Sequence, residues 1–327
     1  MPPRSVLVCT HGHCFDGMAS AALFTRLRAS IGGASAATYS YKSCGYGPGM
    51  SQIPASWLKS DENAILDFRF TETPKLDWYF DHHPTAFGSG DEQARALADA
   101  DGGRKLYWDA QYGSCAKLIA DVARTRFDEP LTALADLVAW ADRIDAARFA
   151  DAVEATSVKE PAMKLAAIVE QHGNGAFLEL MVPRLLERSL DDIAGMTDVV
   201  DLWKPIEASR AAFTAELQSR TEVRGSVVIV DLGDRVIGAA PKFVTYAAFP
   251  QCTYSVTVAR TQKLVKVGVG YNPWGDKPRL HDIAAICRRA GGGGHPVVGA
   301  VSFPTTAIDQ ARALATAIAL ELDGPPS

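Results

Sequence analysis

This sequence lacks long apolar runs. No stretch approaches the ~18 consecutive apolar residues of a transmembrane helix. The apolar run at 6–9, VLVC, is short and precedes no small-residue cleavage site. We therefore expect neither a membrane-spanning segment nor a signal peptide. Since 47% of the residues are hydrophobic, the chain still has ample apolar material for globular cores.

Cysteine is also scarce, and positive charge is not in excess. Six cysteines are scattered over 327 residues without a CxxC pair, which is typical of reduced cytosolic thiols rather than of a disulfide framework. The formal net charge of −5 argues against binding to duplex DNA or to an anionic membrane, because both need a basic surface. We expect a cytoplasmic protein that can still bind a small anionic substrate through a local cluster.

The N-terminal part alternates strand and helix patterns. Apolar or β-branched runs predict four strands, at 5–10, 36–43, 64–70 and 75–83. A helical pattern of Ala and Leu begins at Met18, so strand, polar loop and helix form the start of a βαβ unit. We therefore expect an open parallel α/β sheet, followed by a mostly helical region at 112–192.

The pattern changes after a long helical stretch. Residues 196–223 predict one long helix or a broken pair, which can bridge two domains. Beyond it, β-branched residues alternate with turns, and the segment ends in an amphipathic helix. We therefore predict a domain at 1–195, a linker helix at 196–223 and a smaller α+β domain at 224–327.

Histidine and carboxylate residues gather after the predicted strands. They occur in HGHCFDG at 11–17, at Asp67 and in DHH at 81–83. Parallel strands place their carboxyl ends at one edge of a sheet, where ligands bind, so these groups can converge. Imidazole and carboxylate ligands together suit Mn²⁺, Fe²⁺, Co²⁺ or Zn²⁺ ahead of Ca²⁺. They are numerous enough for a pair of metals, with Asp67 well placed to bridge them.

Three clusters contain the histidines of interest: His-Gly-His at 11–13, DHH at 81–83 and GGGGH at 291–295. Each alone is weak evidence for a site. A His-Gly-His in a loop is more often exposed to solvent than a metal ligand, and GGGGH at 291–295 is typical of a turn or a helix stop. The three clusters together, in this order, are far more specific than any one of them.

Five segments, in this order, resemble those of the DHH phosphoesterase family: HGHCFDGMASA, ILDFRF, FDHHPTA, WADRIDAARF and GGGGHPVVGAVSF. The resemblance extends over the whole chain. It implies an N-terminal parallel-sheet DHH domain, a smaller C-terminal DHH-associated domain of α+β type, and an active site in the cleft between them. It also implies two divalent metal ions, with Mn²⁺ as the first choice.

The resemblance further implies roles for individual residues. The implied metal ligands are His11, Cys14 and Asp67 for one ion, and Asp16, Asp67, His82 and Asp142 for the other. Asp81 would fix an imidazole by a hydrogen bond, and His83 would face the substrate phosphate. The implied substrate-binding residues of the C-terminal domain are Gly292, Gly293, Gly294, His295, Arg260 and Arg289.

Three positions depart from the family pattern or stay open. Most members have an aspartate where Cys14 stands, and a softer thiolate would shift the metal preference towards Fe²⁺, Co²⁺ or Zn²⁺. In WADRIDAARF, either Asp142 or Asp145 can supply the fourth-motif ligand, and we prefer Asp142. His13 has no clear family role, and a loop histidine is its simpler interpretation.

These inferences predict a metal-dependent phosphoesterase that cleaves a phosphodiester or phosphomonoester with a metal-activated hydroxide. The expected substrates are small: a short single-stranded oligonucleotide, a linear dinucleotide or a 3′-phosphoadenosine nucleotide, and not duplex DNA. The alternatives are a pyrophosphatase or exopolyphosphatase, for which a more basic C-terminal cluster is expected, and a non-catalytic nucleotide-binding regulator. A homodimer is compatible with the sequence.

Overall fold

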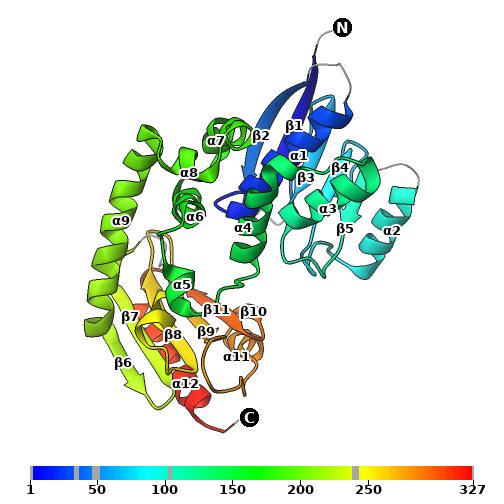
Figure 1. Cartoon of the computed structure of the whole chain (residues 1–327). Coiled ribbons are helices and arrows are strands. Elements are labelled where there is room, and N and C mark those ends of the chain that lie inside the picture. Colours follow the sequence, from blue (N-terminus) through cyan, green and yellow to red (C-terminus); the bar gives the residue numbers. More distant parts are fainter. Residues whose placement is uncertain (1–2, 33–36, 46–51, 102–104, 238–242, 326–327) are drawn as a thin grey trace. The chain divides into compact units, whose positions relative to one another are not determined.

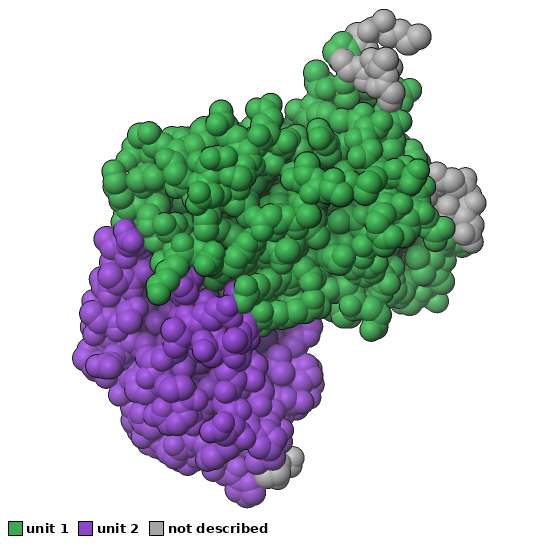
Figure 2. Space-filling view, viewed as in Figure 1, with its two compact units in different colours: residues 1–148, 158–204 green, residues 149–157, 205–327 purple. Residues whose placement is uncertain are grey.

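The computed structural model describes residues 3–32, 37–45, 52–101, 105–237 and 243–325. The chain divides into two compact units, coloured separately in Figure 2: residues 1–148 with 158–204, and residues 149–157 with 205–327. The division falls inside helix α9 (Thr197–Leu217), between Lys204 and Pro205. Residues 196–223 thus contain one long helix rather than a broken pair. The domain limits at 195 and 224 stay a prediction.

The first unit is built on a five-stranded parallel sheet (Figure 1). Its strand order is β2-β1-β3-β4-β5, and every neighbouring pair is parallel, which confirms the predicted sheet. The strands are β1 (Arg4–His11), β2 (Ala37–Cys44), β3 (Glu62–Leu66), β4 (Trp78–Asp81) and β5 (Lys105–Trp108). The sequence pattern does not predict β5, because its four residues form no extended apolar run.

The strand order determines where a ligand can bind. Strand β1 lies between β2 and β3, so the chain moves to one side of β1 for the second strand and to the other side for the third. In an open parallel sheet, the carboxyl ends of the strands on either side of such a switch point form the binding crevice. His11 ends β1, and Asp67 follows the last residue of β3 directly. The topology therefore brings two of the predicted metal ligands to the switch point.

Helices cover both faces of this sheet. Phe24 of α1 (Phe15–Ile31) makes edge-on ring contacts with Trp78 and Phe80 on one face. Ala96 of α2 (Gly90–Asp101) belongs to the apolar cluster around Tyr79, whose side chain points to the other face of β4. The remaining helices of this unit are α3 (Cys115–Phe127), the 3₁₀ turn η1 (Thr132–Leu134), α4 (Ala135–Asp145), α6 (Pro161–His172), α7 (Gly175–Glu187) and α8 (Leu190–Ala194).

Helix α1 begins earlier than the sequence pattern predicts. It starts at Phe15, with Cys14 in an extended conformation at the N-cap, and not at Met18. The polar residues of the HGHCFDG segment conceal the first turn, because a pattern of Ala and Leu appears only after it. Asp16 therefore sits in the first helical turn, where the helix dipole favours a negative charge.

The second unit contains a six-stranded mixed sheet, in the order β10-β11-β9-β8-β7-β6. Only β7 and β8 pair in parallel, and the other pairs are antiparallel. The strands are β6 (Thr221–Arg224), β7 (Val227–Val236), β8 (Tyr254–Arg260), β9 (Val265–Tyr271), β10 (Gly293–His295) and β11 (Val298–Phe303). With them lie α5 (Ala152–Thr156), the 3₁₀ turn η2 (Gln218–Arg220), α10 (Val244–Ala248), α11 (Ile283–Arg289) and α12 (Ile308–Asp323). The predicted α+β class is confirmed.

Two local conformations of this unit are not evident from the sequence pattern. Residues 244–248 form a short helix rather than a strand, although Val, Thr and Tyr favour strands. The GGGGH segment is more than a helix stop, because Gly293–His295 pair with β11 as a short edge strand. In neither case does a run of five residues or fewer specify its own conformation, and tertiary contacts decide it.

A search of the described ranges for a helix of sufficient length and hydropathy to span a bilayer finds none. This agrees with the absence of long apolar runs from the sequence.

Gly17 offers a direct test of how α1 packs against the end of β1. A Cβ atom at this position would lie 2.1 Å from the carbonyl oxygen of His11, which is backbone and cannot move aside. Gly17→Ala should therefore lower the free energy of unfolding by about 1–3 kcal/mol in urea denaturation. Gly90→Ala is the matched control, because its Cβ would meet no atom within 4 Å. Equal midpoints for both variants and the wild type would contradict this packing.

Candidate metal centre

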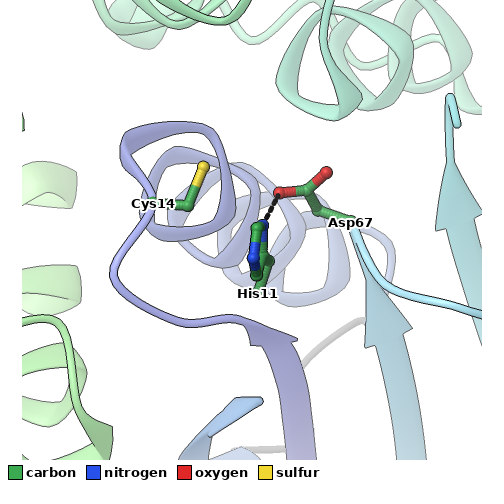
Figure 3. A group of neighbouring side chains, drawn as sticks. All are labelled: His11, Cys14 and Asp67. Carbon is green, nitrogen blue, oxygen red and sulfur yellow. Dashed lines mark ion pairs between the residues drawn. The ribbon is translucent and has the colours of Figure 1, made fainter. Parts of the chain in front are cut away.

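The first group of candidate ligands lies at the switch point of the parallel sheet (Figure 3). His11 comes from the end of β1, Cys14 from the N-cap of α1 and Asp67 from the residue after β3. One potential ligand atom from each lies within 4.8 Å of the other two, and His11 Nδ1 is 3.6 Å from Asp67 Oδ2. The three residues that the sequence assigns to one metal are thus close enough to share one.

Asp67 adopts a backbone conformation that costs energy. Its φ is +53°, in the left-handed region, which non-glycine residues rarely occupy. The backbone N–H of Asp67 donates a hydrogen bond of 2.9 Å to the carbonyl of Phe80, which ties the turn to the neighbouring strand. Such conformations persist where the surrounding structure imposes them, and they concentrate at functional sites. Here the turn holds the carboxylate at the edge of the sheet.

A second group surrounds His82, just beyond the end of β4. His82 Nε2 lies 3.3 Å from Asp145 Oδ2 and 3.8 Å from Asp16 Oδ2. The same nitrogen is 3.6 Å from Asp67 Oδ1. Asp67 belongs to the first group and also to a further group with His82 and His83, so it links the ligands around His11 to those around His82. This is the position that a bridging ligand between two ions would occupy.

Asp16 is held by the N-terminus of another helix. Its two carboxylate oxygens accept hydrogen bonds from the backbone N–H groups of Cys115 at 2.7 Å and Ala116 at 2.9 Å. These are the first two residues of α3, whose N-cap is Ser114. Unpaired N–H groups and the helix dipole both favour a carboxylate at such a place. The sequence gives no sign of this support, because 99 residues separate Asp16 from Cys115.

Both histidines of the DHH motif are oriented by hydrogen bonds at Nδ1. His82 Nδ1 lies 3.1 Å from the backbone carbonyl of Tyr112, and His83 Nδ1 lies 2.7 Å from Asp81 Oδ1. We assign the Nδ1 proton from these acceptors, which leaves Nε2 of each ring for a metal or a substrate. Asp81 therefore makes the hydrogen bond to an imidazole that the resemblance implies. The sequence does not predict the contact with Tyr112, because a backbone carbonyl leaves no mark on the residue type.

The geometry favours Asp145 as the ligand from WADRIDAARF, although Asp142 is the aspartate preferred from the sequence. Asp145 Oδ2 faces His82, whereas Asp142 Oδ2 forms an ion pair of 2.5 Å with Arg148. The other oxygen of Asp142 accepts a hydrogen bond of 3.5 Å from the hydroxyl of Ser114. The two aspartates lie on α4 almost one turn apart, and only the later one reaches the ligand group. Sequence spacing alone could not distinguish them.

Several buried atoms of the site make no hydrogen bond with any residue that the structure describes. These atoms are both carboxylate oxygens of Asp67 and Nε2 of His82. A buried polar atom without a partner costs about 1–3 kcal/mol, and more where the group is charged. Divalent cations bound on either side of Asp67 would satisfy these atoms. The donor set of thiolate, imidazole and carboxylate therefore fits a borderline transition metal.

The pKa values of the site show the same need for positive charge. Burial raises the pKa of the Cys14 thiol, and the nearby charge of Asp67 raises it further. Burial and the charge of Asp67 likewise raise the pKa of Asp16. Burial also disfavours the charged form of Asp67, but contacts with His11 and His82 outweigh it and lower its pKa to about 2. Several acidic groups thus compete for few compensating charges, which a bound cation would supply.

His13 makes hydrogen bonds that connect the loop after β1 to the end of α6. Its backbone N–H donates to the carbonyl of Gly173 at 3.0 Å, and its Nδ1 lies 3.1 Å from the carbonyl of Glu170. Its φ of +54° turns the chain between His11 and Cys14. His13 belongs to none of the ligand groups found among the described residues. The contacts agree with its interpretation as a loop histidine.

The glycines of the second unit serve close backbone pairing. A Cβ at Gly292 would lie 2.1 Å from the carbonyl oxygen of Ala300, and one at Gly294 would lie 2.2 Å from that of Val298. Gly294 also has a φ of +149°. His295 ends this short strand and is exposed. The exposed His295 thus follows a segment of backbone that carries no side chains.

The two arginines of this unit that the resemblance assigns to substrate binding, Arg260 and Arg289, make other contacts than with the hairpin of β10 and β11. Arg289 is held in an ion pair by Glu321 of α12. Arg260 pairs with Val265 in the sheet, at the end opposite to the hairpin, where Val298 pairs with His295 and Gly270. Five residues along a strand correspond to about 17 Å. Arg260 and His295 therefore would not contact the same phosphate.

Comparison with known proteins identifies the fold. No protein-family model and no curated protein sequence matches the chain. Among solved structures, the pGpG-specific phosphodiesterase PggH from Vibrio cholerae is similar with a TM-score of 0.70 and 19% identity, over 98% of this chain and 100% of that one. The DHH domain of a member of a ribosomal protein family has a TM-score of 0.61 and 11% identity, over 98% and 88% of the two chains.

RecJ from Thermus thermophilus, in complex with Mn²⁺, gives a TM-score of 0.59 and 14% identity. The alignment covers 98% of this chain but 53% of RecJ, so the chain spans about half the length of that protein. The chain therefore has the fold of DHH-domain proteins, as the sequence resemblance predicts.

The revised choice of aspartate predicts different metal affinities for two neighbouring substitutions. Asp145→Asn should weaken Mn²⁺ binding by at least about 10-fold, because it replaces a charged ligand beside His82. Asp142→Asn should leave Mn²⁺ affinity unchanged, since Asp142 pairs with Arg148 instead. Calorimetric titration of the two purified variants measures both. A loss of Mn²⁺ binding in Asp142→Asn alone would restore the original preference.

Metal binding should also release protons. Burial disfavours the charged form of His82, but the nearby carboxylates, Asp67 first, outweigh it and raise its pKa to about 9. Near neutral pH the metal-free imidazole is therefore protonated, and a metal must displace that proton. We expect Mn²⁺ affinity to rise with pH up to about 9. Calorimetry at pH 7.5 in buffers of different ionisation enthalpy counts the protons, and a count of zero would contradict the assignment.

Proposed function

We propose that this chain is a metal-dependent phosphoesterase that hydrolyses a small nucleotide substrate. The observation that carries the proposal is the convergence of buried ligand atoms on Asp67 and His82, at the switch point of a parallel sheet, with no hydrogen bond to any described residue. Unsatisfied buried polar groups are costly and are kept where function requires them. The likeness of the fold to a phosphodiesterase over almost the whole length of both chains supports the same reaction class.

The chain offers ligands for two divalent ions. One would be held by His11, Cys14 and Asp67, and the other by Asp16, Asp67, His82 and Asp145. Such ions supply Lewis acidity and lower the pKa of bound water, which is the chemistry that hydrolysis at phosphorus needs. Mn²⁺ suits the carboxylates and imidazoles, and the Cys14 thiolate adds affinity for Fe²⁺, Co²⁺ or Zn²⁺.

His83 is the side chain best suited to act on the substrate itself. Its Nδ1–H is occupied by Asp81, and 36% of the side chain is exposed, so Nε2 can face a phosphate. Burial opposes protonation, but the hydrogen bond to Asp81 outweighs it and raises the pKa of His83. A protonated Nε2 donates a hydrogen bond to a phosphate oxygen or a proton to the leaving oxygen. Asp81 keeps the ring in the orientation and tautomer that this needs.

A 5′-phosphorylated linear dinucleotide is our first choice of substrate. PggH is named for its action on pGpG, and its full length is matched by this chain. In the second unit, His295 and the glycines before it, Gly293 and Gly294, are the groups that would bind a phosphate. The backbone N–H of Gly292 already donates to the carbonyl of Cys287. The net charge of −5 gives no support to binding of duplex DNA. We do not assign Arg260 to the same phosphate as His295.

A substrate panel tests the function. Purified protein would be assayed with Mn²⁺, Co²⁺ or anaerobic Fe²⁺ against pGpG, short RNA, 3′-phosphoadenosine 5′-phosphate and pyrophosphate. We expect pGpG or a short oligonucleotide to be hydrolysed fastest, and Asp67→Asn and His82→Ala to lose at least about 100-fold in kcat/KM. Asp201→Asn is the control, since Asp201 makes an exposed ion pair with Lys204 on α9.

Each outcome of the panel decides between reaction classes. Preferential hydrolysis of pyrophosphate would replace the phosphoesterase proposal by a phosphoanhydride hydrolase. Metal-loaded protein that releases phosphate from none of the four substrates would favour a nucleotide-binding regulator. Full activity of Asp67→Asn would overturn the two-metal site.

A further inference from the structure

Asp142 does not join the ligand groups, yet it is held firmly in place. Its side chain is partly buried, with 17% exposed, and it pairs with Arg148 at 2.5 Å. The backbone N–H of Arg148 donates to the carbonyl of Arg143 at 2.9 Å, which closes the turn after α4. Ala147, within this turn, has a left-handed φ of +49°. The turn thus directs Arg148 back towards Asp142.

Both members of this pair press against one glycine. A Cβ at Gly113 would lie 2.6 Å from Asp142 Oδ1 and 2.7 Å from Arg148 Nη2. The absent side chain of Gly113 therefore leaves the space in which the carboxylate and the guanidinium meet. Any other residue here would displace one of them.

Gly113 belongs to the turn that supports the candidate metal centre. The residue before it, Tyr112, accepts the hydrogen bond from His82, and the residue after it, Ser114, caps the helix whose first N–H groups hold Asp16. Arg148 also follows the candidate ligand Asp145 by only three residues. Its guanidinium consequently packs against Gly113, in the turn that positions two of the candidate ligands.

We propose that Arg148 binds a phosphate group of the substrate at the edge of the metal centre, and that Asp142 positions Arg148 for this contact. The inference rests on the proposed function, because it assumes a phosphate-bearing ligand. Arg148 keeps 59% of its side chain exposed, so the guanidinium has donors left after it pairs with Asp142. Arginine presents these donors as a planar fork that matches phosphate oxygens.

Arg143 is the other arginine near this turn, but its contacts make it less suited than Arg148 to bind phosphate. Arg143 lies over the ring of Trp140, with its guanidinium carbon 5.2 Å from the ring centroid, and its Nε donates to the carbonyl of Arg148. Arg143 thus supports the turn. Attraction to the C-terminal end of α4 would explain a positive charge at Arg148, but it would not require an aspartate partner or a glycine cradle.

The test separates phosphate binding from metal binding. We would measure the Kd of inorganic phosphate for Mn²⁺-loaded protein by calorimetry, and the Kd of Mn²⁺ for metal-free protein. Arg148→Gln should weaken phosphate binding by about 10-fold or more, and Arg148→Lys by less, because lysine keeps the charge and loses the fork. Asp142→Asn should weaken phosphate binding several-fold. The double variant with Asp142→Asn and Arg148→Gln should bind phosphate no more weakly than Arg148→Gln alone. Mn²⁺ affinity should stay unchanged throughout.

Glu72 and Arg95 provide matched controls. They form an exposed ion pair in the same unit, with an N–O distance of 3.2 Å. Glu72→Gln and Arg95→Gln should leave both dissociation constants as in the wild type. Thermal melting of every variant identifies unfolding, and Arg148→Lys gives a second measurement should Arg148→Gln fail to fold.

Three results would overturn the inference: unchanged phosphate affinity in Arg148→Gln, additive losses in the double variant, or loss of Mn²⁺ affinity in Asp142→Asn. The last would make Asp142 a ligand rather than a positioning residue. Failure of the proposed function looks different. A protein that binds phosphate through Arg148 but hydrolyses no phosphate ester would keep the inference and refute the phosphoesterase.

Discussion

The candidate site depends on one buried carboxylate. Asp67 is 1% exposed, has a left-handed backbone and leaves both oxygens without a hydrogen bond to any described residue. A folded chain tolerates such a group only if something else compensates its charge. Nearby histidines do so in part, as the pKa of Asp67 at about 2 indicates. Cations shared between its two oxygens would do so fully, and this explains why the other ligands face it.

Much of the first unit can be understood as support for that arrangement. The strand order puts His11 and Asp67 on either side of the switch point. The N-terminus of α3 holds Asp16, and a backbone carbonyl in the preceding turn holds His82. Each of these two ligands is thus fixed by a hydrogen bond that does not involve a metal. Such support lowers the entropic cost of forming the site, since the ligands are already oriented when an ion arrives.

The sequence predicts the parallel sheet and the edge where the ligands meet, because strand ends and polar clusters coincide along the chain. It also predicts the mixed second unit. Five of the candidate ligands that it names lie in the groups that the structure brings together: His11, Cys14, Asp16, Asp67 and His82. It could not distinguish Asp142 from Asp145, since that choice depends on how α4 is rotated against α3. Nor could it find Tyr112, whose backbone oxygen makes the contact. Nor could it show that Arg260 lies at the far end of the sheet from His295, because that depends on strand pairing, which sequence pattern does not reveal.

Anomalous diffraction from crystals of the Mn²⁺-loaded protein tests the central claim most directly. We expect two manganese peaks about 3.5–4 Å apart, with one oxygen or both of Asp67 in contact with each ion. His11 and Cys14 should bind one ion, and Asp16, His82 and Asp145 the other. A manganese ion that does not touch Asp67, or a second peak that Asp142 ligates instead of Asp145, would contradict the account.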